Sequence, residues 1–82
     1  MRVTLKLPKL GQSMQAGTIL EWLVRDGEDV TEGQPLYILE SEKTAMEIEC
    51  PYSGTISELC VPSEGIAVGT PIAVIDRRPP KP

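Results

Sequence analysis

The stretch Gly17-Thr18-Ile19-Leu20-Glu21-Trp22-Leu23-Val24 recurs later in the chain as Gly54-Thr55-Ile56-Ser57-Glu58-Leu59-Cys60-Val61. The Gly, Thr, Ile, Glu and Val of the two copies stand at one constant offset. Both copies have the short length and the β-branched residues of a strand. The sequence therefore contains one strand pattern twice, which indicates an internal repeat.

A second block of residues repeats as well, so that the duplication covers most of the chain. Residues 33–39 match residues 69–75, and the segment from Val3 to Pro8 matches the segment from Met46 to Pro51. Each copy reads as strand, Pro, loop, Gly-Thr-Ile strand, Gly-x-Pro turn and apolar strand. Two copies are too few for a solenoid. They suit a closed, all-β sandwich whose halves are related by a pseudo-twofold axis.

The junction between the two copies is the most informative place for function. It runs from Glu40 to Thr44 and contains Lys43. If the copies pack about a twofold axis, this junction is the counterpart of the place where the chain ends meet. We therefore expect Lys43 to project from the end of the domain opposite both termini.

The residues around this junction carry conflicting local signals. Glu, Lys, Ala and Met are good helix formers and would permit a short helix over residues 40–49. However, Met46, Ile48 and Cys50 alternate with more polar neighbours, and the repeat aligns them with the first strand. We predict two strands joined by a tight turn at residues 41–44.

Other segments give further expectations. Val3, Leu5 and Leu7 predict a first strand with one dry face, and Val30 is the single apolar anchor of a turn-rich connection. Residues 51–54 predict a hairpin turn in which Gly54 takes a positive φ. The pattern leaves open which face of the sandwich Trp22 takes.

Composition excludes several classes of function. The 82 residues form one small domain with a modest core, and the net charge of −4 with a pI near 4.7 argues against nucleic-acid binding. The chain has no histidine, which removes the usual catalytic triads and the commonest general base, so a small enzyme is disfavoured. Neither a membrane span nor a signal peptide is visible, and no metal site is expected.

Cys50 and Cys60 are expected to remain free thiols. In an antiparallel hairpin closed at residues 51–54, Cys50 would pair near Thr55 and Cys60 would lie near Ala45. The two cysteines would then lie too far apart along the ladder for a disulfide. This interpretation agrees with a reducing compartment.

Lys43 has an ordinary interpretation and a functional one. A lysine beside Glu40 and Glu42 can simply blunt the edge of a hairpin and keep the protein soluble. Its position favours function, because the other lysines adjoin the first strand or lie in the tail, at Lys6, Lys9 and Lys81.

Several motifs in one order resemble the lipoyl domains of 2-oxo acid dehydrogenase acyltransferases. They are Leu7-Pro8-Lys9-Leu10-Gly11-Gln12-Ser13, then Gly17-Thr18-Ile19, then Gly27 with Val30 and Gly33, then Glu40-Ser41-Glu42-Lys43, and Pro51-Tyr52-Ser53-Gly54. Each motif alone is weak, but their order and spacing are specific. The likeness covers about residues 3–76.

The resemblance implies a flattened β-barrel or sandwich of two four-stranded antiparallel sheets. It implies lipoate in amide linkage to Lys43, with Glu42 and Thr44 as turn neighbours. In the family, a thiamin-dependent 2-oxo acid decarboxylase acylates the dithiolane, an acyltransferase core passes the acyl group to coenzyme A, and dihydrolipoamide dehydrogenase reoxidises the dithiol. The domain is then a monomeric carrier rather than a catalyst, in the bacterial cytoplasm or the mitochondrial matrix.

The resemblance also suggests residues that partners recognise. A lipoate ligase or lipoyl transferase must read the turn around Lys43. In the family, the loop after the first strand helps the decarboxylase to select its carrier, and acidic side chains could steer a basic partner. The candidate recognition residues are Leu10, Gly11, Gln12, Ser13, Glu40 and Glu47.

Alternatives remain beside this interpretation. The biotin-carrying relative has Met on both sides of its lysine, where this chain has Glu42 and Thr44. The family often has Asp before the lysine and Ala after it, and acidic residues where this chain has Gln12 and Ala16. The aminomethyl carrier of glycine cleavage has a similar tip but is longer. An unmodified acidic β-sandwich that acts only as an adaptor is the rival from another class.

The sequence predicts a carrier domain over residues 1–76. Residues 77–82, Arg-Arg-Pro-Pro-Lys-Pro, have the composition of the start of an interdomain linker. The expected parent polypeptide is a dihydrolipoamide acyltransferase.

Overall fold

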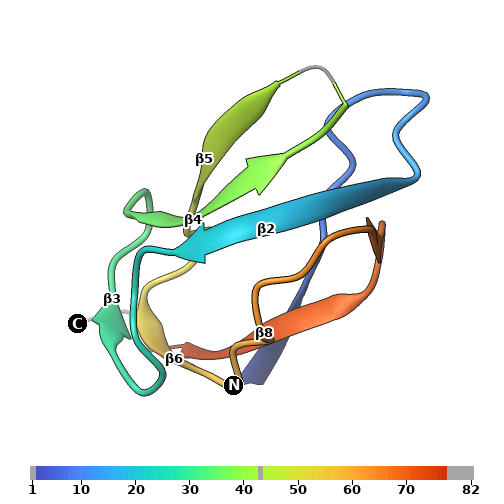
Figure 1. Ribbon diagram of the computed structural model, residues 1–82. Coiled ribbons are helices and arrows are strands. Elements are labelled where there is room, and N and C mark those ends of the chain that lie inside the picture. Colours follow the sequence, from blue (N-terminus) through green and yellow to red (C-terminus); the bar gives the residue numbers. More distant parts are fainter. Residues whose placement is uncertain (1, 43, 78–82) are drawn as a thin grey trace.

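The computed structural model describes residues 2–42 and 44–77, which form eight β-strands and no helix (Figure 1). The strands are β1 (Arg2–Lys6), β2 (Ala16–Trp22), β3 (Asp29–Val30), β4 (Pro35–Glu40), β5 (Ala45–Glu49), β6 (Gly54–Ser57), β7 (Ile66–Ala67) and β8 (Pro71–Arg77). The predicted all-β class is confirmed.

The strands form two four-stranded antiparallel sheets, with the orders β1-β8-β6-β3 and β5-β4-β2-β7. Replacing each strand by its repeat partner (β1 by β5, β6 by β2, β3 by β7, β8 by β4) converts the first order into the second. The register obeys the same rule, because Val3 pairs with Ile75 where Met46 pairs with Leu39. The pseudo-twofold sandwich is therefore confirmed. Among the described residues the two sheets do not close into a barrel.

Side chains from both sheets fill the space between them. The alternation predicted for the first strand holds, since Arg2, Thr4 and Lys6 are exposed while Leu7 is buried. Val30 has no exposed surface, as its role of anchor requires. The buried core consists of Leu7, Ile19, Val24, Val30, Leu36, Tyr37, Leu39, Cys50, Ile56, Ile72, Ala73 and Ile75.

Trp22 lies at the rim of this core, which settles the orientation that the pattern left open. Its indole Nε1–H donates a hydrogen bond to the Cys60 carbonyl oxygen at 2.8 Å. Its ring centroid lies 4.9 Å from that of Tyr37. Trp22 therefore joins the segment after β6 to the opposite sheet and has a structural role.

The two Gly-x-Pro turns have matching backbones. Gly33 and Gly69 have φ values of +90° and +89°, in the left-handed region that favours glycine. Each turn leads into a strand that begins with Pro, where a missing amide donor is tolerated.

The hairpin predicted at residues 51–54 is wrong. β5 and β6 belong to different sheets, so this segment crosses from one sheet to the other. The Cys50 amide donates to the Gln34 carbonyl oxygen rather than to a strand across the turn. The reason lies in the repeat, because β5 takes the place of β1, which likewise does not pair with the strand that follows it. The cysteines are nevertheless free thiols, as expected.

Glycine is needed at position 54 because of a close backbone contact, not because of the positive φ that the sequence predicts. It is not among the described glycines with positive φ. A Cβ built on it would overlap the Asp76 carbonyl oxygen and would lie 3.0 Å from the Arg77 Cα. Glycine is needed here because the β8 backbone passes so close.

The last strand extends beyond the expected start of the linker. Arg77 belongs to β8 and pairs with Gly54, and its guanidinium carbon lies 4.4 Å from the centre of the Tyr52 ring. This cation–π contact and the backbone pairing hold Arg77 on the domain.

The hairpin formed by β4 and β5 lies at one end of the sandwich, and the start of β1 lies at the other (Figure 1). β8 ends near the start of β1, because Arg2 pairs with Asp76. The predicted separation of the junction turn from the chain ends is therefore confirmed for the described residues. Lys43 itself lies outside them.

Replacing Gly54 by Ala should destabilise the domain, because the new methyl group meets backbone atoms that cannot rotate away. We expect a loss of about 3 kcal/mol, at the upper end of the range for overpacking. Urea unfolding followed by Trp22 fluorescence measures it. Gly11→Ala is the matched control, since a Cβ there has no atom within 4 Å, and its change should stay within about 0.5 kcal/mol. Equal stability of the two variants would contradict this account of the Gly54 site.

Candidate functional site

The turn between β4 and β5 is closed by two hydrogen bonds from Ser41 to one carbonyl oxygen. The Ser41 amide donates to the Thr44 carbonyl oxygen at 2.7 Å, and the Ser41 hydroxyl donates to the same oxygen at 3.3 Å. Below the turn, Glu40 pairs with Ala45 in the ladder. Glu42 and Thr44 are both exposed. The predicted tight turn is confirmed, and it presents the two sequence neighbours of Lys43 to solvent.

The loop between β1 and β2 lies beside this turn and is fixed at both ends. At its start, the Leu7 amide donates to the Thr70 carbonyl oxygen, and the Gly69 amide donates to the Leu7 carbonyl oxygen. At its end, the Val68 amide donates to the Gln15 carbonyl oxygen at 2.9 Å. Both attachments lie on the segment around β7 and β8, so the sandwich determines where this loop is held.

Met14 fixes the middle of the loop. Its sulfur accepts a hydrogen bond from the Leu10 amide at 3.2 Å, and its own amide donates to the Gly11 carbonyl oxygen. A Cβ on Gly17 would lie 2.8 Å from the Met14 methyl carbon and 2.9 Å from a Leu39 methyl carbon. The absent side chain of Gly17 thus leaves the space into which Met14 and Leu39 pack.

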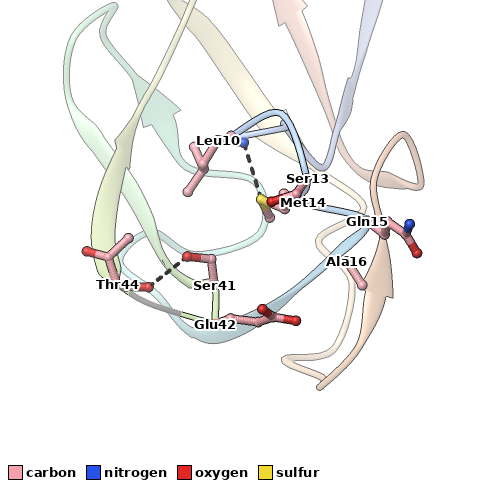
Figure 2. A pocket seen from close by; sticks show the side chains of 9 residues that line it. Leu10, Ser13, Met14, Gln15, Ala16, Ser41, Glu42 and Thr44 are labelled. Carbon is pink, nitrogen blue, oxygen red and sulfur yellow. Dashed lines mark hydrogen bonds between the residues drawn. The ribbon is translucent and has the colours of Figure 1, made fainter.

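A groove of about 700 Å³ separates the loop from the turn (Figure 2). Figure 2 shows the side chains of the loop on one side and those of the turn on the other. Its lining combines apolar side chains with hydroxyl, amide and carboxylate groups. The lining residues are Leu10, Gly11, Ser13, Met14, Gln15, Ala16, Ser41, Glu42 and Thr44.

The predicted recognition residues fall in different places around this groove. Leu10, Gly11 and Ser13 line it, so this part of the loop lies next to the turn. Gln12 is exposed on the same loop but is not among the lining residues. Glu40 borders a second, neighbouring hollow with the turn residues.

Glu47 lies away from the groove, on the outer face of the second sheet. It shares a row with Ile38 and Glu21, one residue along from the inward-facing row that contains Ile19 and Leu39. Because side chains alternate between faces, Glu47 and Glu21 point outward.

Sequence reasoning did not single out Met14, Gln15 or Ala16 as site residues, although all three line the groove. A signal was available for Met14. A large apolar residue in a surface loop needs a packing partner, and Gly17, which leaves space for one, follows three residues later. Gly54 stands at the equivalent position in the other repeat, but there glycine is needed because backbone atoms of β8 pass close by. Comparing the two repeats therefore could not have shown that Met14 packs against Gly17.

The groups whose pKa is shifted lie in the core rather than at the groove. Burial, with the nearby Cys60 as a smaller cause, raises the pKa of Tyr37 to about 12. Burial raises the pKa of the Cys50 thiol, and Glu32 adds to the rise. Burial also raises the pKa of the Cys60 thiol. These shifts keep the groups neutral, the opposite of an activated nucleophile.

The described residues contain neither a cluster of metal ligands nor a membrane-spanning helix. Across residues 2–42 and 44–77, no group of His, Cys, Asp and Glu side chains is arranged to hold a metal ion. The same residues include no helix that could span a bilayer.

Known proteins share this sequence pattern. The family model Biotin_lipoyl, described as biotin-requiring enzyme, matches residues 3–75. The chain is 42% identical over 92% of its length to the dihydrolipoyllysine-residue acetyltransferase component of the pyruvate dehydrogenase complex of Zymomonas mobilis. It is 38% identical to the pyruvate dehydrogenase E1 component subunit beta of Rhizobium meliloti, and 37% identical to the acetyltransferase component of the acetoin cleaving system of Bacillus subtilis, in both cases over 92% of its length.

The matched region is a small part of these relatives. The chain covers 18%, 17% and 19% of their respective lengths, less than a fifth in each case. The three relatives carry different names, and each contains a region that is similar to this chain.

The raised pKa values predict that stability falls at high pH. In the unfolded chain Tyr37 loses its proton near its ordinary pKa of 10, whereas in the folded chain it keeps the proton to about 12. The contribution of neutral Tyr37 to the free energy of unfolding is therefore complete below pH 10 and is lost between about pH 10 and 12. Urea midpoints measured from pH 8 to 12 should decline more steeply for the wild type than for Tyr37→Phe. If the urea midpoints of the two proteins declined in parallel, ionisation of Tyr37 would not be the cause of the lost stability.

Proposed function

The chain belongs to the Biotin_lipoyl family, and from this membership we propose that it is a lipoyl carrier domain whose swinging arm is attached to Lys43. The observation that carries the proposal is the described turn, which exposes Glu42 and Thr44 at the end of the domain remote from the start of β1. A carrier needs its attachment residue accessible to several partners in turn. A domain tethered at one end and loaded at the other meets that need.

The family carries a covalently attached lipoyl or biotinyl group, and we assign lipoate to this chain. The acetyltransferase relatives are named for a dihydrolipoyllysine residue. The flanking Glu42 and Thr44 also differ from the Met pair of the biotin-carrying relative. The groove beside the turn suits the same group, because Leu10, Met14 and Ala16 offer apolar surface next to it.

The division of labour follows from the residues present. When attached, the dithiolane supplies the acyl-transfer and redox chemistry. The domain positions the attachment point through the Ser41 and Thr44 hydrogen bonds and the β4–β5 ladder. With no histidine in the chain and burial keeping both thiols neutral, its own residues supply presentation and recognition rather than catalysis.

Partners follow from this assignment. We propose a thiamin-dependent 2-oxo acid decarboxylase, an acyltransferase core, dihydrolipoamide dehydrogenase and a lipoate ligase or lipoyl transferase. The loop residues Leu10, Gly11, Gln12 and Ser13 would be read by the decarboxylase together with the turn, because both border one groove. Glu40 and Glu47 would contribute negative charge toward a basic partner surface.

The parent polypeptide is proposed to be a dihydrolipoamide acyltransferase, located in the bacterial cytoplasm or the mitochondrial matrix. Its carrier domain would include residues through Arg77, because that residue is held by β6 and Tyr52. The Pro-rich residues 78–82 would begin the linker to other domains.

Moving the lysine by one position should abolish modification, because the ligase reads a folded turn. We expect Glu42→Lys/Lys43→Glu and Lys43→Thr/Thr44→Lys, which exchange neighbours and keep the composition, to gain no lipoyl group. Intact-mass measurement after expression with lipoate ligase and lipoate provides the result. Lys9→Arg is the control and should be modified as fully as the wild type.

A shifted lysine that is lipoylated as well as the original would refute this geometry. A wild-type domain that gains no adduct would favour the adaptor interpretation instead, and one that gains biotin would favour the biotinyl carrier.

Changing the recognition loop should impair the decarboxylase without affecting lipoylation. For Gln12→Arg, which adds a charge on the exposed loop outside the groove lining, we expect about a tenfold lower kcat/KM for reductive acylation, equivalent to about 1.4 kcal/mol. Thr31→Arg adds the same charge on another exposed loop and should leave kcat/KM unchanged. Equal effects of the two variants would mean that overall charge, not this loop, is recognised.

A further inference from the structure

We propose that the groove between residues 10–16 and the 41–44 turn is an intramolecular resting site for the apolar end of the arm on Lys43. The inference rests on the proposed function, since it requires a lipoyl group at that residue. It adds a bound state to a carrier that would otherwise leave its arm in solvent between encounters.

Chain connectivity brings the arm to the groove. Glu42 and Thr44 both line it, and Lys43 is the one residue between them. Consecutive Cα atoms are about 3.8 Å apart, so the attachment point is within one residue of the groove on either side. A group tethered at such short range has an effective concentration in the millimolar range, so that weak contacts suffice to hold it.

The chemistry of the lining matches the chemistry of the arm. Leu10, Met14 and Ala16 present carbon and sulfur, and Ser13, Gln15 and Ser41 bring polar groups to the same groove. The end of a lipoyl arm is a short methylene chain that carries a dithiolane ring. Each methylene buried from water contributes about 0.8 kcal/mol. The volume of about 700 Å³ falls within the range of about 300–1,000 Å³ found for small-molecule sites.

The groove is formed before any ligand enters it. Met14 is fixed by the Leu10 amide and packs with Leu39 above Gly17. The neighbouring Gln15 is held by Val68, and the turn is closed by Ser41 and Thr44. Binding therefore does not have to order the loop, which removes a cost that weak sites cannot meet.

One consequence concerns the partners. Three of the residues that line the groove, Leu10, Gly11 and Ser13, are also among those proposed to be read by the decarboxylase. A partner that binds this loop would compete with the resting arm, so that recognition and release use the same surface. The arm would then be exposed mainly when a partner is present.

The methionines provide a direct test on the intact domain. The chain has three, Met1, Met14 and Met46. Of the two that the structure describes, Met14 lines the groove and Met46 does not. With carbon-13 in the methionine methyl groups, lipoylation verified by intact mass should shift the Met14 methyl resonance. The Met46 methyl, 45% exposed on β5, is the internal control and should not move.

A pair of variants tests the same site chemically. Ala16→Glu places a charge in the groove, whereas Gln12→Glu places the same charge on the loop outside the lining. Both would be lipoylated first, and the dithiolane would then be reduced with a water-soluble phosphine. We expect wild type and Gln12→Glu to react about threefold more slowly than Ala16→Glu, as expected for an arm at rest in the groove most of the time.

The outcomes separate the two claims. A lipoylated domain with an unchanged Met14 resonance, or equal reduction rates for all three proteins, would overturn the resting site and leave the carrier function intact. A wild-type domain that gains no lipoyl adduct would overturn both.

Discussion

The backbone pairing of β4 with β5 is the constraint on which the rest of the site depends. Glu40 opposite Ala45, together with the Ser41 amide on the Thr44 carbonyl oxygen, fixes a short turn in which Glu42 and Thr44 face solvent. Moving β5 by one residue in that register would turn Ile48 away from the core and bring Glu47 and Glu49 to the face that packs against it. The same β4–β5 register is thus required both to fill the core and to form the turn.

Duplication explains why the 41–44 turn and the described chain ends lie at opposite ends of the domain. In the repeat, the β4–β5 pair corresponds to the β8–β1 pair, with equivalent register. The first pair is joined by the 41–44 turn. The second contains the start of β1 and the last described residues of the chain. A pseudo-twofold axis therefore places the turn of the first pair and the strand ends of the second at opposite ends of the domain.

Much of this fold could be predicted because its signals are local and repeated. Gly33 and Gly69 precede Pro at equivalent places, and the structure gives them nearly the same φ. The strands around Lys43 were predicted correctly because alternation in residues 45–50 outweighed helix propensity. The tertiary features were less accessible. The hairpin at residues 51–54 failed because local turn chemistry says nothing about which sheet a strand joins.

The groove shows the same limit. Leu10 and Ser13 could be named through a family resemblance, whereas Met14 and Ala16 could not, because their place depends on how a loop returns to a distant turn. Gly17 and Gly54 occupy equivalent positions, and each faces an equivalent carbonyl oxygen, that of Glu40 or that of Asp76. Their nearest neighbours nevertheless differ, because the side chains of Met14 and Leu39 crowd Gly17 whereas the β8 backbone crowds Gly54. Equivalent sequence thus does not imply equivalent contacts, and the difference between the two repeats becomes visible only in the packed structure.

The most direct test of the central claim is a competition for the attachment residue. The domain would be incubated with a lipoate ligase and a biotin ligase together, each with its cofactor and ATP, and the modified peptide would be identified by tandem mass spectrometry. The account predicts a lipoyl amide on Lys43 and on no other lysine. A biotinyl group there, or a lipoyl group on Lys6, Lys9 or Lys81, would contradict it.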